Sequence, residues 1–162
     1  MASDRENPEP CPEPRPEPVL HEDRLNYTPV AGSVTLARHR AARLIAEWGH
    51  PELAWSVALV VSELGTNALK HGTVRGRLFQ VRSVLRPSGL RVEVSDPRGE
   101  RLPLARSAAD DACFGRGLSI VTQVADRWGT EPRTVGKTVF AEFDVRRGVG
   151  TGSVNRGGGG AG

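Results

Sequence analysis

Apolar residues recur at helical spacing in two consecutive segments. The first predicts a helix over residues 33–48, which Gly49 can end. Its stripe is formed by Leu36, Arg40, Leu44, Ile45 and Trp48. Pro51 then opens a second helix at a position where its missing N–H does no harm. This second helix directs inward Leu53, Val57, Val60, Val61, Leu64 and Ala68, and it stops at Gly72.

The pattern then changes to strict alternation, which predicts strands. Residues 77–86 and 90–95 alternate and are joined by the turn RPSG, as expected of an antiparallel hairpin. One face of the second strand carries Leu90, Val92 and Val94.

An irregular stretch over residues 96–114 precedes a return to helical spacing. The third helix is predicted from near Leu118 to Trp128, and a last strand follows from Thr138 to Val145. The inward residues of this strand are Val139, Ala141, Phe143 and Val145.

The order helix, helix, hairpin, loop, helix, strand predicts an α+β fold. We expect a two-layer sandwich in which helices cover one face of a mostly antiparallel sheet. Residues 1–26 are rich in Pro and Glu and are predicted to be a disordered arm, and residues 147–162 a disordered Gly-rich tail. One domain therefore remains, over residues 27–146.

Charge is distributed unevenly along the chain. The net charge is +3, but residues 1–24 carry seven acidic and three basic side chains, which leaves +7 on residues 25–162. A basic domain suits an anionic ligand or an acidic partner. Direct nucleic-acid binding is disfavoured, because the basic residues are scattered and only 5% of the chain is aromatic.

Composition also bears on location and on metal binding. The chain contains no run of about 18 apolar residues and does not begin like a secretory signal, so we expect a cytoplasmic protein without a membrane span. Its two cysteines, Cys11 and Cys113, lie far apart in the sequence and indicate neither a disulfide framework nor a metal cluster.

The segment VVSELGTNALKHG places three polar residues on one side of the second helix. Glu63, Asn67 and His71 follow each other at intervals of four residues. The amide oxygen of Asn67 is a suitable ligand for Mg²⁺, and Glu63 could deprotonate a hydroxyl or a water. A hydrogen-bond network at the helix end, with His71 against the dipole, is the structural alternative.

Two further segments suit a nucleotide. The hairpin strand delivers Asp96 at its end, where a carboxylate could accept a hydrogen bond from an adenine amino group, and Gly99 would let the backbone approach the base. Asp-Pro is also a common turn signal. In FGRGLSIV, Gly115 and Gly117 precede the helix that begins near Leu118, and free N–H groups at a helix start attract phosphate.

The segment GKTVFAEF begins the last strand with Lys137 and Thr138. The hydroxyl of Thr138 could bond adenine directly or through water, although strand threonines usually only satisfy β propensity.

Together these segments, in this order, resemble the ATPase superfamily shared by gyrase, the large heat-shock chaperone, histidine kinases and mismatch-repair ATPases, which has the Bergerat fold. The chain is most similar to the anti-sigma-factor serine kinase branch over residues 28–145. The motifs that carry the resemblance are SELGTNALKHG, VEVSDP, GRGLSIV, ADRWG and GKTVFAEF.

The resemblance implies ATP and Mg²⁺ as cofactors and a role for each motif. Glu63 would be the catalytic base and Asn67 the magnesium ligand. Adenine would be contacted by Asp96 with Gly99 and by Thr138, and the phosphates would be bound at Gly115, Gly117 and Leu118. Such kinases phosphorylate a serine on an anti-sigma-factor antagonist, sequester a sigma factor, and usually form homodimers.

Two other functions are compatible with the sequence. A module that captures a protein partner without phosphorylating it is favoured by Arg98 and Glu100, because the superfamily often reads Asp-x-Gly-x-Gly where this chain has Asp96 to Glu100. The catalytic domain of a histidine kinase is disfavoured, because no helical hairpin with a phosphoacceptor histidine precedes the domain, and His39 lies within the first helix of the domain itself.

Overall fold

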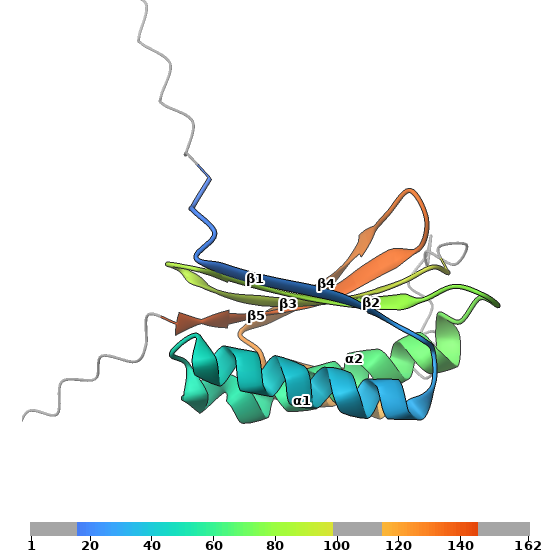
Figure 1. The fold of residues 1–162 in the computed structure, drawn as a ribbon, viewed down its shortest axis with the longest axis horizontal. Helices are drawn as coiled ribbons and strands as arrows, with labels where there is room; N and C mark the ends of the chain where they lie inside the picture. The colour runs from blue at the N-terminus through green and yellow to red at the C-terminus, as the bar shows by residue number, and fades with distance from the viewer. Residues whose placement is uncertain (1–15, 99–114, 146–162) are drawn as a thin grey trace, which may run out of the picture.

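Five antiparallel strands form a sheet, and helices cover one of its faces (Figure 1). This computed structural model describes residues 16–98 and 115–145. The strand order is β1-β2-β3-β5-β4. The elements are β1 (His21–Tyr27), α1 (Ala31–Glu47), the 3-10 helix η1 (Pro51–Leu53), α2 (Ala54–His71), β2 (Phe79–Arg86), β3 (Gly89–Asp96), α4 (Gly115–Val124), β4 (Arg127–Pro132) and β5 (Lys137–Asp144). The predicted α+β sandwich of the Bergerat type is confirmed.

Helix α2 has the inward face that the sequence predicts. Its buried residues are Val57, Val60, Val61, Leu64, Gly65 and Ala68, and Gly72 caps its end. They pack with the helix-facing side chains of the hairpin, which include Val81, Leu90, Val92 and Val94. Because one face of the helix and one face of the sheet are both apolar, burying them together stabilises the two layers.

Helix α1 is rotated relative to the predicted stripe. Leu36, expected to face inward, is 67% exposed, and Arg40 binds the carboxylate of Asp23 on β1 through contacts of 3.0 and 2.6 Å. The buried residues are instead Ser33, Val34, Ala37, Ala41 and Ile45. These side chains are mostly small, and Val34 would lie 3.2 Å from a Cβ at position 65 of α2, so a close approach of the helices selects this face.

The sequence pattern predicts neither edge strand of the sheet. Residues 21–26, expected to belong to the disordered arm, form β1, and the third helix ends at Val124 instead of Trp128, which lies in β4. These strands are largely polar because each pairs on one side only and is anchored by hydrogen bonds and ion pairs. Residues 1–15 of the predicted arm, the predicted tail and most of the stretch 96–114 lie outside the described residues.

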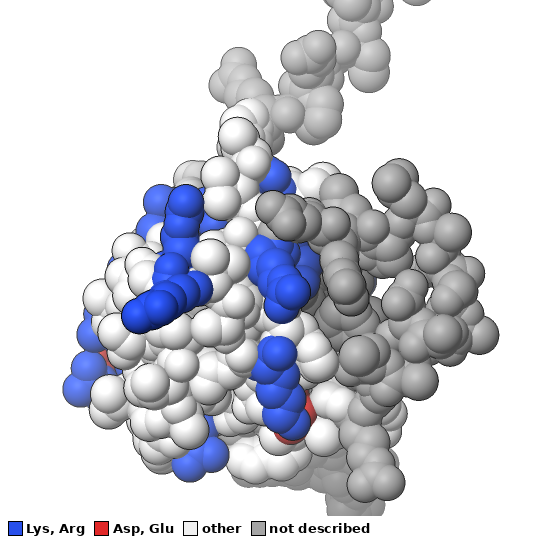
Figure 2. All heavy atoms as spheres, turned by 90° about the vertical axis from the view of Figure 1, so that its right-hand side faces the viewer, with Lys and Arg blue, Asp and Glu red and all other residues white. Residues whose placement is uncertain are grey.

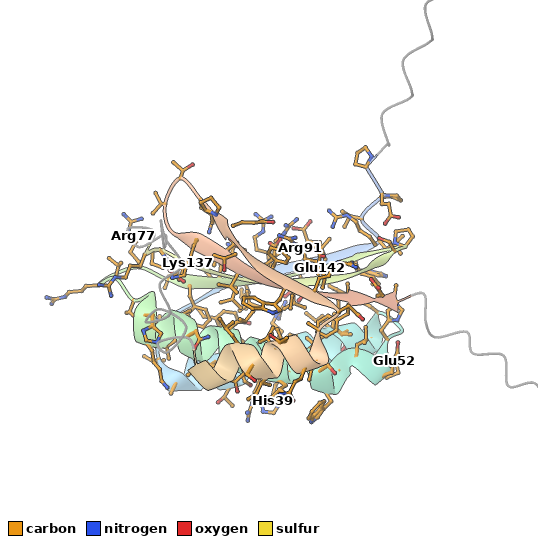
Figure 3. All side chains as sticks on the ribbon, turned by 180° about the vertical axis from the view of Figure 1, so that it is seen from behind. His39, Glu52, Arg77, Arg91, Lys137 and Glu142 are labelled. Carbon is orange, nitrogen blue, oxygen red and sulfur yellow. The ribbon has the colours of Figure 1, made fainter. Side chains whose placement is uncertain are left out.

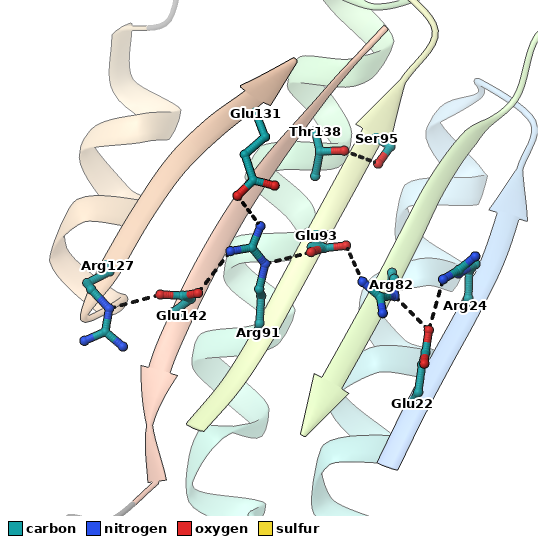
Figure 4. Close-up of polar contacts among 10 residues, drawn as sticks. All are labelled: Glu22, Arg24, Arg82, Arg91, Glu93, Ser95, Arg127, Glu131, Thr138 and Glu142. Carbon is teal, nitrogen blue, oxygen red and sulfur yellow. Dashed lines mark hydrogen bonds and ion pairs between the residues drawn. The ribbon is translucent and has the colours of Figure 1, made fainter. Parts of the chain in front are cut away.

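Charged side chains line the sheet face opposite the helices (Figure 4). Arg91 on β3 is central, because its guanidinium contacts Glu93 at 2.7 Å, Glu131 at 2.8 Å and Glu142 at 3.0 Å. The same guanidinium lies 3.8 Å from the ring centroid of Phe140. Further ion pairs continue this outer-face network in both directions, to Arg82, Glu22 and Arg24 on one side and to Arg127 and Asp144 on the other.

Among residues 16–98 and 115–145, no helix has the length and apolar character needed to cross a membrane.

Candidate functional site

Glu63 and Asn67 lie one turn apart on α2 and meet the start of α4. A Cβ built on Gly117 of α4 would lie 2.7 Å from Glu63 Oε2 and 3.7 Å from Asn67 Oδ1. A larger residue at position 117 would displace the Glu63 carboxylate, whereas the distance to Asn67 is an ordinary van der Waals contact. The structure thus brings together the predicted catalytic base Glu63, the predicted magnesium ligand Asn67 and the predicted phosphate-binding residue Gly117.

The neighbours of Gly117 complete this turn of α4. Gly115 is the first residue of the helix, so its backbone belongs to the helix start, where N–H groups have no partner within the helix. Leu118 is half-buried, and its side chain packs against the hydrophobic core. Its backbone belongs to the first turn of α4, as does that of Gly117.

Asp96 ends β3 as a buried carboxylate, only 4% exposed. Two glycines close around it. A Cβ on Gly72 would lie 2.4 Å from Asp96 Cγ, and a Cβ on Gly136 would lie 1.8 Å from the Asp96 carbonyl oxygen. Gly136 also has a φ of +85°, which side chains disfavour. The sequence pattern predicts a helix end at Gly72 and gives no sign that either glycine packs on Asp96.

Lys137 of β5 is the direct neighbour of Asp96 across the sheet. The β3–β5 register pairs these two residues, and Lys137 Nζ lies 3.5 Å from Asp96 Oδ2. The Arg98 backbone N–H donates to Asp96 Oδ1 at 3.1 Å. Burial raises the pKa of Asp96 above its ordinary value, while Lys137 and the Arg98 N–H oppose this rise. The carboxylate is therefore a strong acceptor in a poorly hydrated position.

The structure does not bring Thr138 to this carboxylate. Thr138 is paired with Ser95, and the two hydroxyl oxygens lie 2.7 Å apart on the outer face of the sheet (Figure 4). Neighbouring residues in a strand point to opposite faces, so Lys137 and Thr138 cannot both face Asp96. The alternation of side chains along the strand predicts this placement. Lys137 lies two residues before inward-facing Val139 and therefore points to the same face of the sheet.

Gly99, the remaining residue proposed for the base, lies outside the described residues.

Exposed cations surround the end of the sheet that carries Asp96. They come from the last turn of α2, the segment before β2, the segment after β3 and the β4–β5 turn, and they are Lys70, Arg75, Arg77, Arg98 and Arg133. Figure 2 looks at this end and shows basic side chains with few acidic atoms in view, and Figure 3 shows Arg77 and Lys137 at this same end. We call these five residues the basic rim. Such a rim attracts a polyanion.

The donor set suits magnesium only in the company of phosphate. In the part of the chain that the structure describes, no group of three or more His, Cys, Asp or Glu side chains could hold a metal ion by itself. Asn67 offers an amide oxygen next to the start of α4, and Mg²⁺ typically combines one or two protein oxygens with phosphates and water. The residues present therefore fit a magnesium nucleotide.

A comparison with protein families gives a match to the histidine kinase-like ATPase domain over residues 28–143. The chain belongs to this family. No curated protein matches the chain. As a histidine kinase-like ATPase domain, it binds ATP.

Within this ATPase domain, the match runs from the residue after β1 almost to the end of β5. It includes Glu63, Asn67, Asp96 and Gly117 and leaves out the edge strand β1. All the described site residues therefore fall within the part of the chain that defines the family.

Proposed function

We propose that the chain is a Mg-ATP-dependent protein serine/threonine kinase that acts as an anti-sigma factor in a partner-switching system. Its partners would be a sigma factor and an anti-sigma-factor antagonist that supplies a serine hydroxyl. The contact between Gly117 and Glu63 carries the proposal, because it puts a carboxylate beside a helix start whose N–H groups suit phosphate.

Each residue of the site would then have a separate task. Asn67 would hold magnesium through its amide oxygen, and the backbone at Gly115, Gly117 and Leu118 would bind the phosphates. Asp96 would accept a hydrogen bond from the amino group of adenine, in a position that burial keeps poorly hydrated. The basic rim would favour the approach of the triphosphate.

Bound Mg-ATP supplies the phosphoryl group and the metal charge that neutralises it. Glu63 would accept the proton of the serine hydroxyl while the γ-phosphoryl group passes to the serine oxygen and ADP leaves, and the helix N–H groups would stabilise negative charge on the phosphate oxygens. Asn67 and Glu63 lie on one side of α2, so the metal ligand and the base act on the same end of the nucleotide.

One observation favours a second function, an ATP-binding module that sequesters a protein partner without phosphorylating it. Glu63 Oε2 lies close to Gly117 at the start of α4, so a movement of α4 on nucleotide binding would change the surroundings of this carboxylate. In that case binding of nucleotide would regulate the position of α4 and the capture of the partner.

The test starts with calorimetric titration of Mg-ATP into the wild type, Asn67→Ala and Asp96→Asn. The proposed site predicts micromolar binding, about −8 kcal/mol, that weakens in both variants. Phosphorylation of candidate antagonist proteins is then measured with the wild type and Glu63→Gln.

Loss of phosphorylation in Glu63→Gln with ATP affinity retained supports the kinase. Nucleotide binding and partner capture by a wild type that transfers no phosphate supports the binding module instead. No binding of nucleotide by the wild type contradicts both.

A further inference from the structure

Lys137 and Asp96 form an unusual pair for a site that reads the amino group of adenine. Their side chains are 12% and 5% exposed, and Nζ lies 3.5 Å from Oδ2. An ammonium group only donates hydrogen bonds, and a carboxylate only accepts them. The end of β3 and the start of β5 thus present a donor and an acceptor side by side.

Two glycines pack on Asp96, on atoms other than Oδ2, the carboxylate oxygen nearest Lys137. Gly72 packs on the carboxylate from α2, and Gly136 packs on the Asp96 backbone from the β4–β5 turn. Because Lys137 Nζ lies 3.5 Å from Asp96 Oδ2, a group that bonds this oxygen also lies close to the ammonium. The two side chains would contact one base together.

A carboxylate alone and a carboxylate paired with an ammonium group differ in the purine edges that they bind. Adenine presents a 6-amino donor next to a ring nitrogen that accepts, whereas hypoxanthine presents a 6-oxo acceptor next to a ring N–H that donates. A carboxylate without a cation beside it repels the 6-oxo oxygen and selects the amino group. A donor and an acceptor side by side can match either edge.

We propose that Lys137 contacts the purine base together with Asp96 and reduces the preference of the site for adenine, so that the proposed nucleotide site binds 6-oxopurine nucleotides as well as adenine nucleotides. This inference rests on the proposed nucleotide site. For ATP, Asp96 accepts from the amino group and Lys137 donates to the neighbouring ring nitrogen. For ITP, Lys137 donates to the oxo group and Asp96 accepts from the ring N–H.

The experiment compares ATP with ITP, which differ only at this edge of the base. Calorimetry with magnesium gives the Kd of each nucleotide for the full-length wild type, Lys137→Met, Lys137→Arg and Lys70→Met. Lys70 is the matched control, because it is an exposed cation at the same end of the sheet, on the last turn of α2. Lys137→Thr provides a second uncharged variant that suits a strand, should Lys137→Met fail to fold.

We expect the Kd of the wild type for ITP to lie within about tenfold of its Kd for ATP. In Lys137→Met, the Kd for ITP should increase about tenfold more than the Kd for ATP. Lys137→Arg keeps the positive charge and should keep the ratio of the two Kd values. Lys70→Met should weaken the binding of both nucleotides by the same factor. An unchanged ratio in both uncharged Lys137 variants, or a wild type that binds ATP but rejects ITP, overturns the inference while the ATP site stands. A wild type that binds neither nucleotide overturns the ATP site and the inference with it.

Discussion

Gly117 of α4 packs against the carboxylate of Glu63 on α2, and a Cβ at position 117 would lie 2.7 Å from Glu63 Oε2. In Gly117→Ala, either the Glu63 side chain or the start of α4 must move away. We expect the affinity for Mg-ATP to fall about tenfold, measured by calorimetry, because the phosphate-binding N–H groups move with the helix.

Gly32→Ala is the control for this substitution, because no atom lies within 4 Å of a Cβ at that position on α1. It should leave ATP affinity unchanged. Wild-type ATP affinity together with wild-type phosphorylation in Gly117→Ala would contradict a role of this contact in the site.

Gly72→Ala tests the other end of the site. Its Cβ would lie 2.4 Å from Asp96 Cγ, so the carboxylate must be displaced from its buried position. We expect ATP affinity to fall about tenfold or more while the fold is kept, since Gly72 follows the last turn of α2. Circular dichroism with calorimetry checks this, and ATP binding equal to that of Gly32→Ala would show that Asp96 does not contact the nucleotide.

Stability should depend on pH through Asp96. Burial raises its pKa above the ordinary value of 3.8, so between these two values the folded chain keeps a proton that the unfolded chain has lost. The stabilisation is complete below pH 3.8 and is lost as the pH rises through the folded pKa. Asp96→Asn lacks this dependence.

Urea denaturation of both proteins from about pH 3.5 to 7 measures the effect. As the pH rises, the free energy of unfolding of Asp96→Asn should increase relative to that of the wild type. The difference between the two should then become constant. A difference that shrinks with rising pH would mean that Lys137 and Arg98 outweigh burial.

The outer-face network should stabilise the sheet through Arg91. This side chain is 19% exposed and contacts three carboxylates, so Arg91→Met leaves partly buried acids with one cation fewer. We expect the free energy of unfolding to fall by about 1–3 kcal/mol, and by less in high salt. Arg24→Met, at a position with a 54% exposed side chain, should lower it by less than about 1 kcal/mol. Equal losses in the two variants would contradict a special role of Arg91.

The parts of the fold that could be predicted are those where burial dictates the pattern. Helix α2 and the β2–β3 hairpin bury whole apolar faces, and the four-residue spacing of Glu63 and Asn67 placed both on one side of α2. Strands β1 and β4 could not be predicted, because edge strands of this sheet are held by hydrogen bonds and ion pairs, which leave no apolar period in the sequence.

The features that the sequence does not predict also include contacts between segments far apart in the chain. That Gly72 and Gly136 enclose Asp96 depends on how α2 and the β4–β5 turn meet β3, which local spacing does not encode. The placement of Thr138 has a different cause, because alternation along β5 directs Lys137 to the face of Asp96 and Thr138 to the opposite face.

The outer-face network also affects how fast a ligand arrives. Because its arginines are matched by carboxylates on the same face, they contribute little to the field at a distance, and the basic rim then dominates the potential at its end of the sheet. A triphosphate diffusing nearby is steered to that end, so the association rate constant should exceed that of an uncharged ligand and fall steeply with ionic strength. The dissociation rate constant, which reflects contacts already formed, should change little over the same range. The ionic strength of the surroundings would then control how quickly the site fills more than how long it stays filled.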